Sequence, residues 1–136
     1  MNVEIIVTET FRREAKKLIK KYQSLKNELS IFEVSLMKKP DQGILILENV
    51  YKIRIAVKSK GKGKSGGLRV VTYLVIPGKD NHSIQVFLLS IYDKSEIENL
   101  PENQIIKIIS DLQKEFQTSE AEEQSKDTEN NNEIES

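Results

Sequence analysis

Two long apolar stretches in the second half of the chain constrain its fold more than any other feature. Residues 68–76 (LRVVTYLVI) and 84–92 (IQVFLLSIY) are rich in β-branched and aromatic side chains and are apolar at odd and even positions alike. Strands of this kind have both faces covered, so we expect them to be central strands of a sheet. The residues from Pro77 to Asn81 predict a turn between them, because Pro presets φ and Gly and Asn accept positive φ.

The rest of the first 116 residues supplies helices and further strands. Strand patterns cover 3–7 and 51–58, the stretch 44–47 is either a short strand or a loop, and helical spacing predicts helices at 11–22, at 24–39 and after Pro101. Thr8 or Thr10 is expected to cap the first helix. We therefore predict an α+β domain over residues 1–116, with a small, mostly antiparallel four-stranded sheet, an N-terminal helical hairpin and a C-terminal helix, in the order β-α-α-β-β-β-α.

Charge is divided unevenly along the chain. The first 116 residues hold 20 of the 21 Lys and Arg residues and 14 of the 21 Asp and Glu residues, a net charge of +6. Residues 117–136 carry a net charge of −6 and almost no apolar side chains, so we expect an acidic, disordered tail. A basic body favours a polyanion as partner.

Composition excludes several classes of protein. The chain has no Cys and a single His, His82, which rules out disulfides, thiolate ligands and a multi-histidine metal site. No secretory signal and no membrane-length apolar run is found, so we expect a cytoplasmic protein without a membrane partner. The loop 61–67 matches GxGxxG and GKS literally, but a strand follows it instead of a helix, so no nucleotide cofactor is expected.

The densest basic segment runs from Lys52 to Arg69 and contains no acid. Its seven cations are Lys52, Arg54, Lys58, Lys60, Lys62, Lys64 and Arg69. Lys52 and Arg54 lie two residues apart on a strand, about 6.7 Å along one face, which suits two contacts to a phosphate backbone. The first helix offers a second basic set in Arg12, Arg13 and Lys16. The alternative for both sets is a solvated surface, with lysines that protect an edge strand from aggregation.

Three segments, FRREAKKLIKKY, YKIRIAVKSKGKGKSGGLRVVTYLV and VFLLSIYDKSEIENL, together resemble the RelE/ParE superfamily of bacterial type II toxin–antitoxin toxins. The chain is most similar to the RelE/HigB branch, over roughly residues 3–112. The resemblance implies a ribosome-dependent endoribonuclease that cuts mRNA in the A site, inhibits translation and is held inactive by a cognate antitoxin. It also implies metal-free chemistry without a cofactor, in which the ribose 2′-OH attacks the adjacent phosphate.

The same resemblance implies roles for individual residues. Lys52 and Arg54 match the paired basic positions of the family's active strand, and Arg69 matches the arginine after the glycine-rich turn. Lys94 follows the last strand, and Tyr92 matches an aromatic position at the sheet rim. No tyrosine occurs at 98–100, where the RelE branch has one, so the general base stays open.

Two questions stay open at the level of sequence. If Lys58 pairs with Arg69, then Lys52, Arg54 and Arg69 share one face of the sheet, whereas a slip of one residue puts Arg69 on the other face. The rival functions are a ParE-like inhibitor of DNA gyrase without nuclease activity and a noncatalytic RNA-binding domain of the same fold.

Overall fold

The structure is a computed structural model that describes residues 2–61, 67–77 and 83–115. The chain divides into two compact units, Met1–Leu100 and Pro101–Ser136. The second unit contributes one helix over residues 102–115, which begins after Pro101 as predicted. The tail at 117–136 and the turn at 78–82 lie outside the described residues, so their predicted properties stay predictions.

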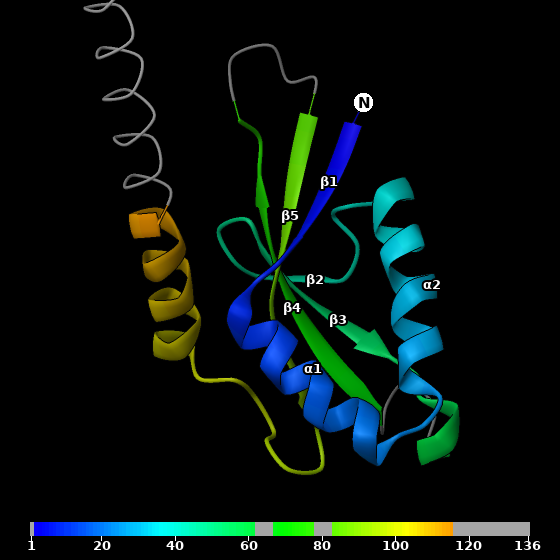
Figure 1. The fold of residues 1–136 in the computed structure, drawn as a ribbon. Helices are drawn as coiled ribbons and strands as arrows, with labels where there is room; N and C mark the ends of the chain where they lie inside the picture. The colour runs from blue at the N-terminus through cyan, green and yellow to red at the C-terminus, as the bar shows by residue number, and fades with distance from the viewer. Residues whose placement is uncertain (1, 62–66, 78–82, 116–136) are drawn as a thin grey trace, which may run out of the picture. The chain divides into compact units, whose positions relative to one another are not determined.

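The first unit is built on a five-stranded sheet (Figure 1). The strands are β1 (Asn2–Val7), β2 (Ile44–Leu47), β3 (Val50–Ile55), β4 (Leu68–Val75) and β5 (Ser83–Asp93). Their order is β1-β5-β4-β3-β2, so the two strands that are apolar on both faces lie inside the sheet, as predicted. All neighbours are antiparallel except β1, which runs parallel to β5.

The α+β class is confirmed, but the predicted number of four strands is wrong. The stretch 44–47 is a strand that pairs with β3. Asn49, between them, adopts a φ of 62°, which closes a tight reversal. Four apolar residues without alternation carry too little periodic signal to separate a strand from a loop.

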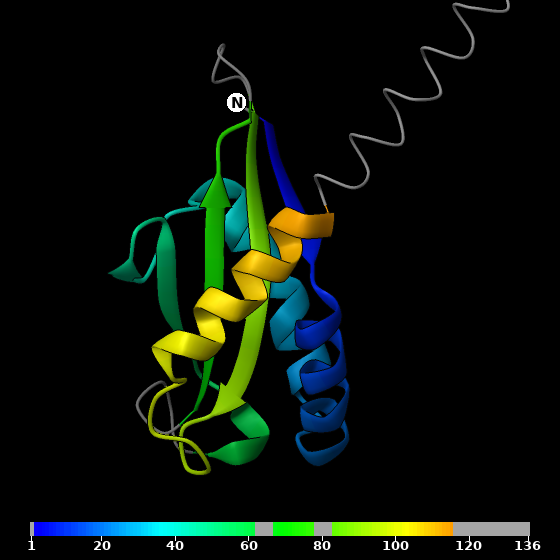
Figure 2. The same ribbon diagram turned by 90° about the vertical axis from the view of Figure 1, so that its left-hand side faces the viewer.

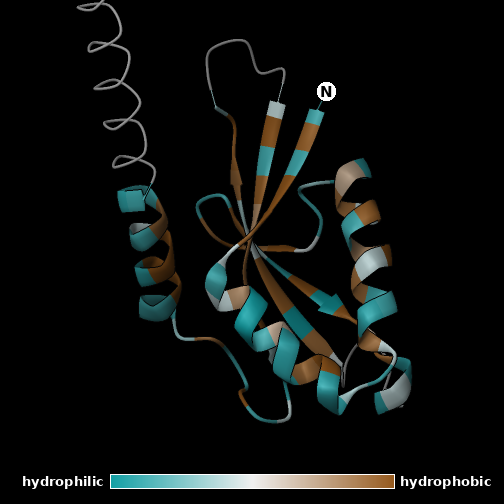
Figure 3. Ribbon diagram, viewed as in Figure 1, coloured by the Kyte–Doolittle hydropathy of each residue, from teal (hydrophilic) through white to brown (hydrophobic). Residues whose placement is uncertain are grey.

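The predicted helical hairpin is formed by α1 (Glu9–Lys21) and α2 (Leu25–Lys38). Thr8 is the N-cap of α1, and its Oγ1 accepts a hydrogen bond from the Phe11 N–H at 3.2 Å. Figure 2 shows both helices on one side of the sheet. Figure 3 shows hydrophilic residues recurring along α1, whose outer face is charged.

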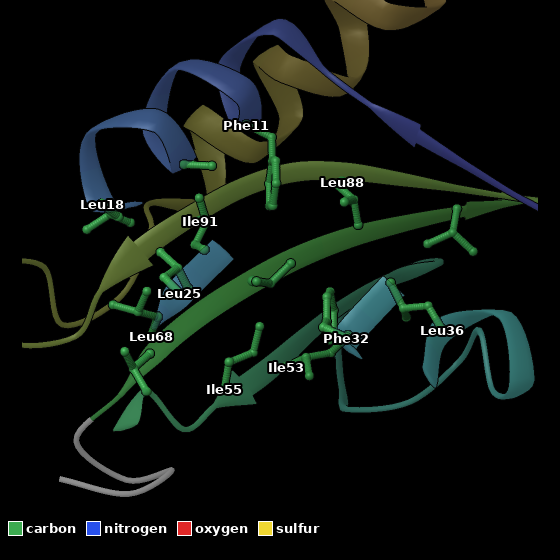
Figure 4. Packing of buried hydrophobic residues seen from close by; sticks show 14 of the residues in the cluster. Phe11, Leu18, Leu25, Phe32, Leu36, Ile53, Ile55, Leu68, Leu88 and Ile91 are labelled. Carbon is green, nitrogen blue, oxygen red and sulfur yellow. The ribbon is translucent and has the colours of Figure 1, made fainter. Parts of the chain in front are cut away.

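The core lies between this hairpin and one face of the sheet (Figure 4). The hairpin contributes Phe11, Leu18, Leu25, Phe32 and Leu36, and the sheet contributes Ile53, Ile55, Leu68, Val70, Leu88 and Ile91. Because side chains alternate along a strand, residues 52, 54 and 69 point to the opposite face. Among the described residues, no helix is long and apolar enough to cross a membrane.

Candidate nucleic-acid interface

Strand register brings three of the predicted site residues into one line across the sheet. Arg54 on β3 pairs with Arg69 on β4, and Arg69 pairs with Tyr92 on β5. Directly opposed residues have Cβ atoms about 4.5–5.5 Å apart. Lys52 lies two positions along β3 on the same face. We call Lys52, Arg54 and Arg69 the basic row.

Strand register answers the question that the sequence left open: the three residues of the basic row share one face, through a pairing other than the one considered for Lys58. Arg69 pairs with Arg54 rather than with Lys58, because β3 ends at Ile55. Lys58 begins a short 3₁₀ helix, η1 (Lys58–Lys60). The two registers differ by four residues along β3, an even number, so the face stays the same.

The two arginines of the row differ in exposure. Arg54 is exposed, whereas Arg69 is only 3% exposed and donates from Nη1 to the carbonyl oxygen of Leu68 at 3.2 Å. Burial and the neighbouring charge of Arg54 lower the pKa of Arg69, while Tyr92 opposes this shift. A guanidinium stays charged at neutral pH in spite of such a shift. The row therefore presents two adjacent fixed positive charges, which suits the oxygens of a phosphate.

Tyr92 is held inside the sheet rather than at its rim. It precedes the last residue of β5 and is 4% exposed, so the predicted rim position offers no free ring face for stacking. Burial raises the pKa of Tyr92, against the opposing effects of a backbone hydrogen bond at Leu100 and of the Arg69 charge. The side chain is thus a neutral phenol at neutral pH.

The segment that follows β5 folds back onto the row, which the sequence did not reveal. Lys52 Nζ donates to Asn99 Oδ1 at 3.2 Å, and the Leu100 backbone reaches Tyr92. Asn99 lies 47 residues from Lys52, and nothing local in the sequence marks the contact. The sequence analysis noted residues 98–100 only because no tyrosine occurs there, where the RelE branch has one.

A cluster around Asp93 was also missed. Asp93 is 2% exposed and accepts hydrogen bonds from Tyr22 Oη at 2.6 Å, from Ser95 Oγ at 2.7 Å and from the Lys60 ammonium. Burial alone would raise the pKa of Asp93, but the hydrogen bonds from Lys60, Tyr22 and Ser95 outweigh it and hold the pKa well below its usual range. We call Asp93, Lys60, Tyr22 and Ser95 the Asp93 cluster.

This cluster includes Lys60, which the sequence analysis grouped with the cations of the basic segment. The Lys60 side chain is 8% exposed and is paired with Asp93, so it does not face solvent as an RNA contact would. Lys58 is exposed, and its backbone N–H donates to the Glu28 carboxylate, which holds η1 against α2. Lys94 is exposed in the turn after β5. Lys62 and Lys64 lie outside the described residues.

The basic residues of α1 are not brought to the row. Arg12, Arg13 and Lys16 are exposed on the outer side of α1, which packs on the opposite face of the sheet. Arg12 lies 3.9 Å from Glu9, an exposed pair that contributes little. These cations form a second, separate surface. Within the described ranges, no three His, Asp or Glu side chains are grouped so that they could hold a metal ion.

Comparison with solved structures finds a likeness to a bacterial toxin. No protein-family model matches the chain. Its structure is similar to that of the free E. coli toxin RelE in a mutant with two arginines replaced by alanine, with a TM-score of 0.50 and 19% sequence identity. The match covers 72% of this chain and 90% of the RelE chain. The fold expected from the sequence resemblance is therefore confirmed.

Proposed function

We propose that this chain, which has the fold of the toxin RelE, is the toxin of a type II toxin–antitoxin pair and a ribosome-dependent endoribonuclease acting on mRNA in the A site. The observation that carries the proposal is the alignment of Arg54, Arg69 and Tyr92 on three adjacent strands, with Lys52 beside them. Its partners would be a cognate antitoxin, the ribosome and mRNA.

In the proposed reaction the ribose 2′-oxygen attacks the adjacent phosphorus and gives its proton to a base. The bond from phosphorus to the 5′-oxygen breaks, that oxygen takes up a proton, and a 2′,3′-cyclic phosphate remains. Arg54 and Arg69 would stabilise the extra negative charge of the transition state, where fixed donors act most strongly. Tyr92, a neutral phenol, suits donation of a proton to the 5′-oxygen better than its removal from the 2′-OH.

The remaining cations would bind RNA on either side of this centre. Lys52 is a donor on the same face, and the exposed Lys58 and Lys94 are available to neighbouring phosphates. Because Arg69 and Tyr92 are nearly buried, we expect the contact between Lys52 and Asn99 to open when RNA binds. The same burial favours a second candidate, a noncatalytic RNA-binding domain that uses only the exposed cations.

Induction in a bacterial host tests the proposal, with primer extension on a translated mRNA. We expect codon-phased cuts from the wild type. In Arg54→Gln we expect mRNA cleavage to fall about 100-fold, since removing one donor that stabilises the transition-state charge costs about 10²–10³ in rate. Arg54 is exposed, so the variant should fold. Lys20→Gln, on the exposed side of α1, is the matched control and should cut like the wild type.

The same experiment separates the rivals. Growth arrest without cuts would contradict the nuclease and favour a gyrase inhibitor of the ParE type. Neither arrest nor cuts, together with binding of RNA in vitro, would favour the noncatalytic domain.

A further inference from the structure

Helix α2 exposes three large apolar side chains on the side that faces away from the sheet. Ile31, Val34 and Met37 are 61%, 55% and 56% exposed. Their spacing of three residues places them in one strip along the helix, opposite the buried Leu25, Phe32 and Leu36. We call Ile31, Val34 and Met37 the α2 stripe. Figure 3 shows that hydrophobic segments, drawn in brown, alternate with hydrophilic ones along α2.

A single exposed apolar residue needs no explanation, but a contiguous strip does. The outer face of helix α1 carries charged residues instead, among them Arg12, Arg13 and Lys16, which are all exposed. Helix α2 has already buried one face in the core, so the stripe contributes nothing to the packing of the hairpin on the sheet. Its exposure is therefore best explained by a partner.

Charge around the stripe indicates the kind of partner. Lys26 and Lys38 are exposed at the two ends of the outer face of α2. Seen down the helix axis, Lys26 projects in nearly the same direction as Met37, and Lys38 projects between the directions of Val34 and Ile31. A surface of apolar residues with lysines at both ends complements an amphipathic helix that carries acidic residues beside its apolar positions.

Two other occupants fit less well. A second copy of this chain, docked with the two α2 helices parallel, would bring Lys26 and Lys38 of one stripe against the same lysines of the other, which is repulsive. The acidic tail, 117–136, has the right charge, but its only apolar residues are Ala121 and Ile134, too few to cover three large side chains. We propose that the α2 stripe, with Lys26 and Lys38, is the docking site for an acidic amphipathic helix of another protein.

The position of this surface gives it a role distinct from that of the basic row. Helix α2 packs on the sheet face opposite to Lys52, Arg54 and Arg69, so a helix bound to the stripe leaves the row uncovered. The inference does not depend on the proposed nuclease, because it uses only the surface of α2. A partner held here would be tethered to the protein without blocking RNA.

The test uses the full chain and two designed helical peptides of about 20 residues, long enough to form helix on binding. Both carry leucines at helical spacing, flanked by Glu in one peptide and by Lys in the other. We expect the Glu peptide to bind by fluorescence anisotropy, and Val34→Gln with Met37→Gln to weaken binding at least tenfold. Lys26→Glu with Lys38→Glu should reverse the preference in favour of the Lys peptide. Lys20→Gln is the control and should bind like the wild type.

Several results would overturn the proposal. One is equal binding of the Glu peptide to the wild type and to the Val34→Gln, Met37→Gln variant, and another is no binding up to about 1 mM peptide. Dimers in sedimentation that this variant abolishes would assign the stripe to a second copy. Binding that appears only when the seven tail acids of the full chain are changed to Gln would assign it to the tail.

Discussion

At the scale of single residues, two buried threonines show how differently the same hydroxyl can act. Thr8 is 7% exposed, and its Oγ1 donates to the Leu88 carbonyl at 2.8 Å while capping α1. Thr72 on β4 is 0% exposed, and its Oγ1 has no hydrogen-bond partner among the described residues. A buried hydroxyl without a partner lowers stability, whereas a capping hydroxyl raises it.

We expect Thr72→Val to raise the free energy of unfolding by about 1 kcal/mol, because the shape is kept and the unpaired hydroxyl is removed. The matched change Thr8→Val should lower it by about 1–2 kcal/mol through loss of the cap. Urea denaturation of both variants measures the two effects. A loss of stability in Thr72→Val would mean that its hydroxyl is satisfied.

Tyr92 gives a second prediction at this scale, which rests on the proposed function. Tyr92→Phe keeps the ring and should lower RNA cleavage about 10²–10⁴-fold if the phenol is the proton donor. Because its pKa is raised, the phenol stays protonated up to and beyond the usual tyrosine value of about 10. Titration of Tyr92 should therefore cause no rise in cleavage between about pH 8 and 10. A rise there that Tyr92→Phe removes would identify a phenolate base instead.

At the scale of elements, the Asp93 cluster fastens three segments together. Asp93 ends β5, Lys60 ends η1 and Tyr22 follows α1, so one carboxylate joins the last strand to the helical hairpin and to the segment before β4. The Asp93 carbonyl also accepts from the N–H groups of Glu96 and Ile97, which closes the turn that carries the chain back toward Lys52.

We expect Asp93→Asn to lower the free energy of unfolding by about 3 kcal/mol at neutral pH, because it leaves the Lys60 ammonium buried without its counterion. The pKa of Asp93 is depressed, so its carboxylate stabilises the fold above the usual aspartate pKa of about 4 and loses this effect as the pH falls below it. The difference between the wild type and the variant should shrink from about pH 5 to pH 2. If the wild type and Asp93→Asn differed by the same free energy of unfolding over this whole pH range, the Asp93 carboxylate would not be the group that stabilises the fold.

Sequence periodicity predicted the helical elements well and the loop between β3 and β4 poorly. The apolar spacing from Phe11 to Tyr22 and the Pro40 that follows α2 are local signals, and both helices formed where they indicated. Lys60 was grouped with its neighbours because the run from 52 to 69 contains no acid. Its partner Asp93 lies 33 residues away, and only the packed fold brings the two together.

At the scale of the whole first unit, positive charge is placed on two separate surfaces. The basic row lies on one face of the sheet, and the cations of α1 lie on the outside of the helix that covers the other face. The sequence predicted both sets and could not predict their separation, because the face of Arg69 depends on strand register. It also gave no account of the burial of Arg69 and Tyr92, which arises from tertiary packing.

Salt dependence should distinguish the two surfaces in binding to single-stranded RNA. Affinity for single-stranded RNA falls as salt rises, and each phosphate contact that is removed makes the slope of log affinity against log salt less steep by about 0.7. We expect this decrease in Arg54→Gln and no change in Lys20→Gln, measured by titration at several salt concentrations. An equal decrease in both variants would place RNA across α1 as well.

The parallel pairing of β1 with β5 has a consequence for the order of events during synthesis. Asn2 pairs with Ser83 and Val7 with Leu88, so β1 finds its partner only in β5, which is synthesised after the other described strands of the sheet. Contacts between such distant positions slow folding, because a long loop must close before they form. Tyr92 and Arg69 also become neighbours only when β5 is in place. A nascent chain interrupted before this strand therefore lacks both the complete sheet and the pairing of Arg69 with Tyr92, and the protein acquires both in the same late step.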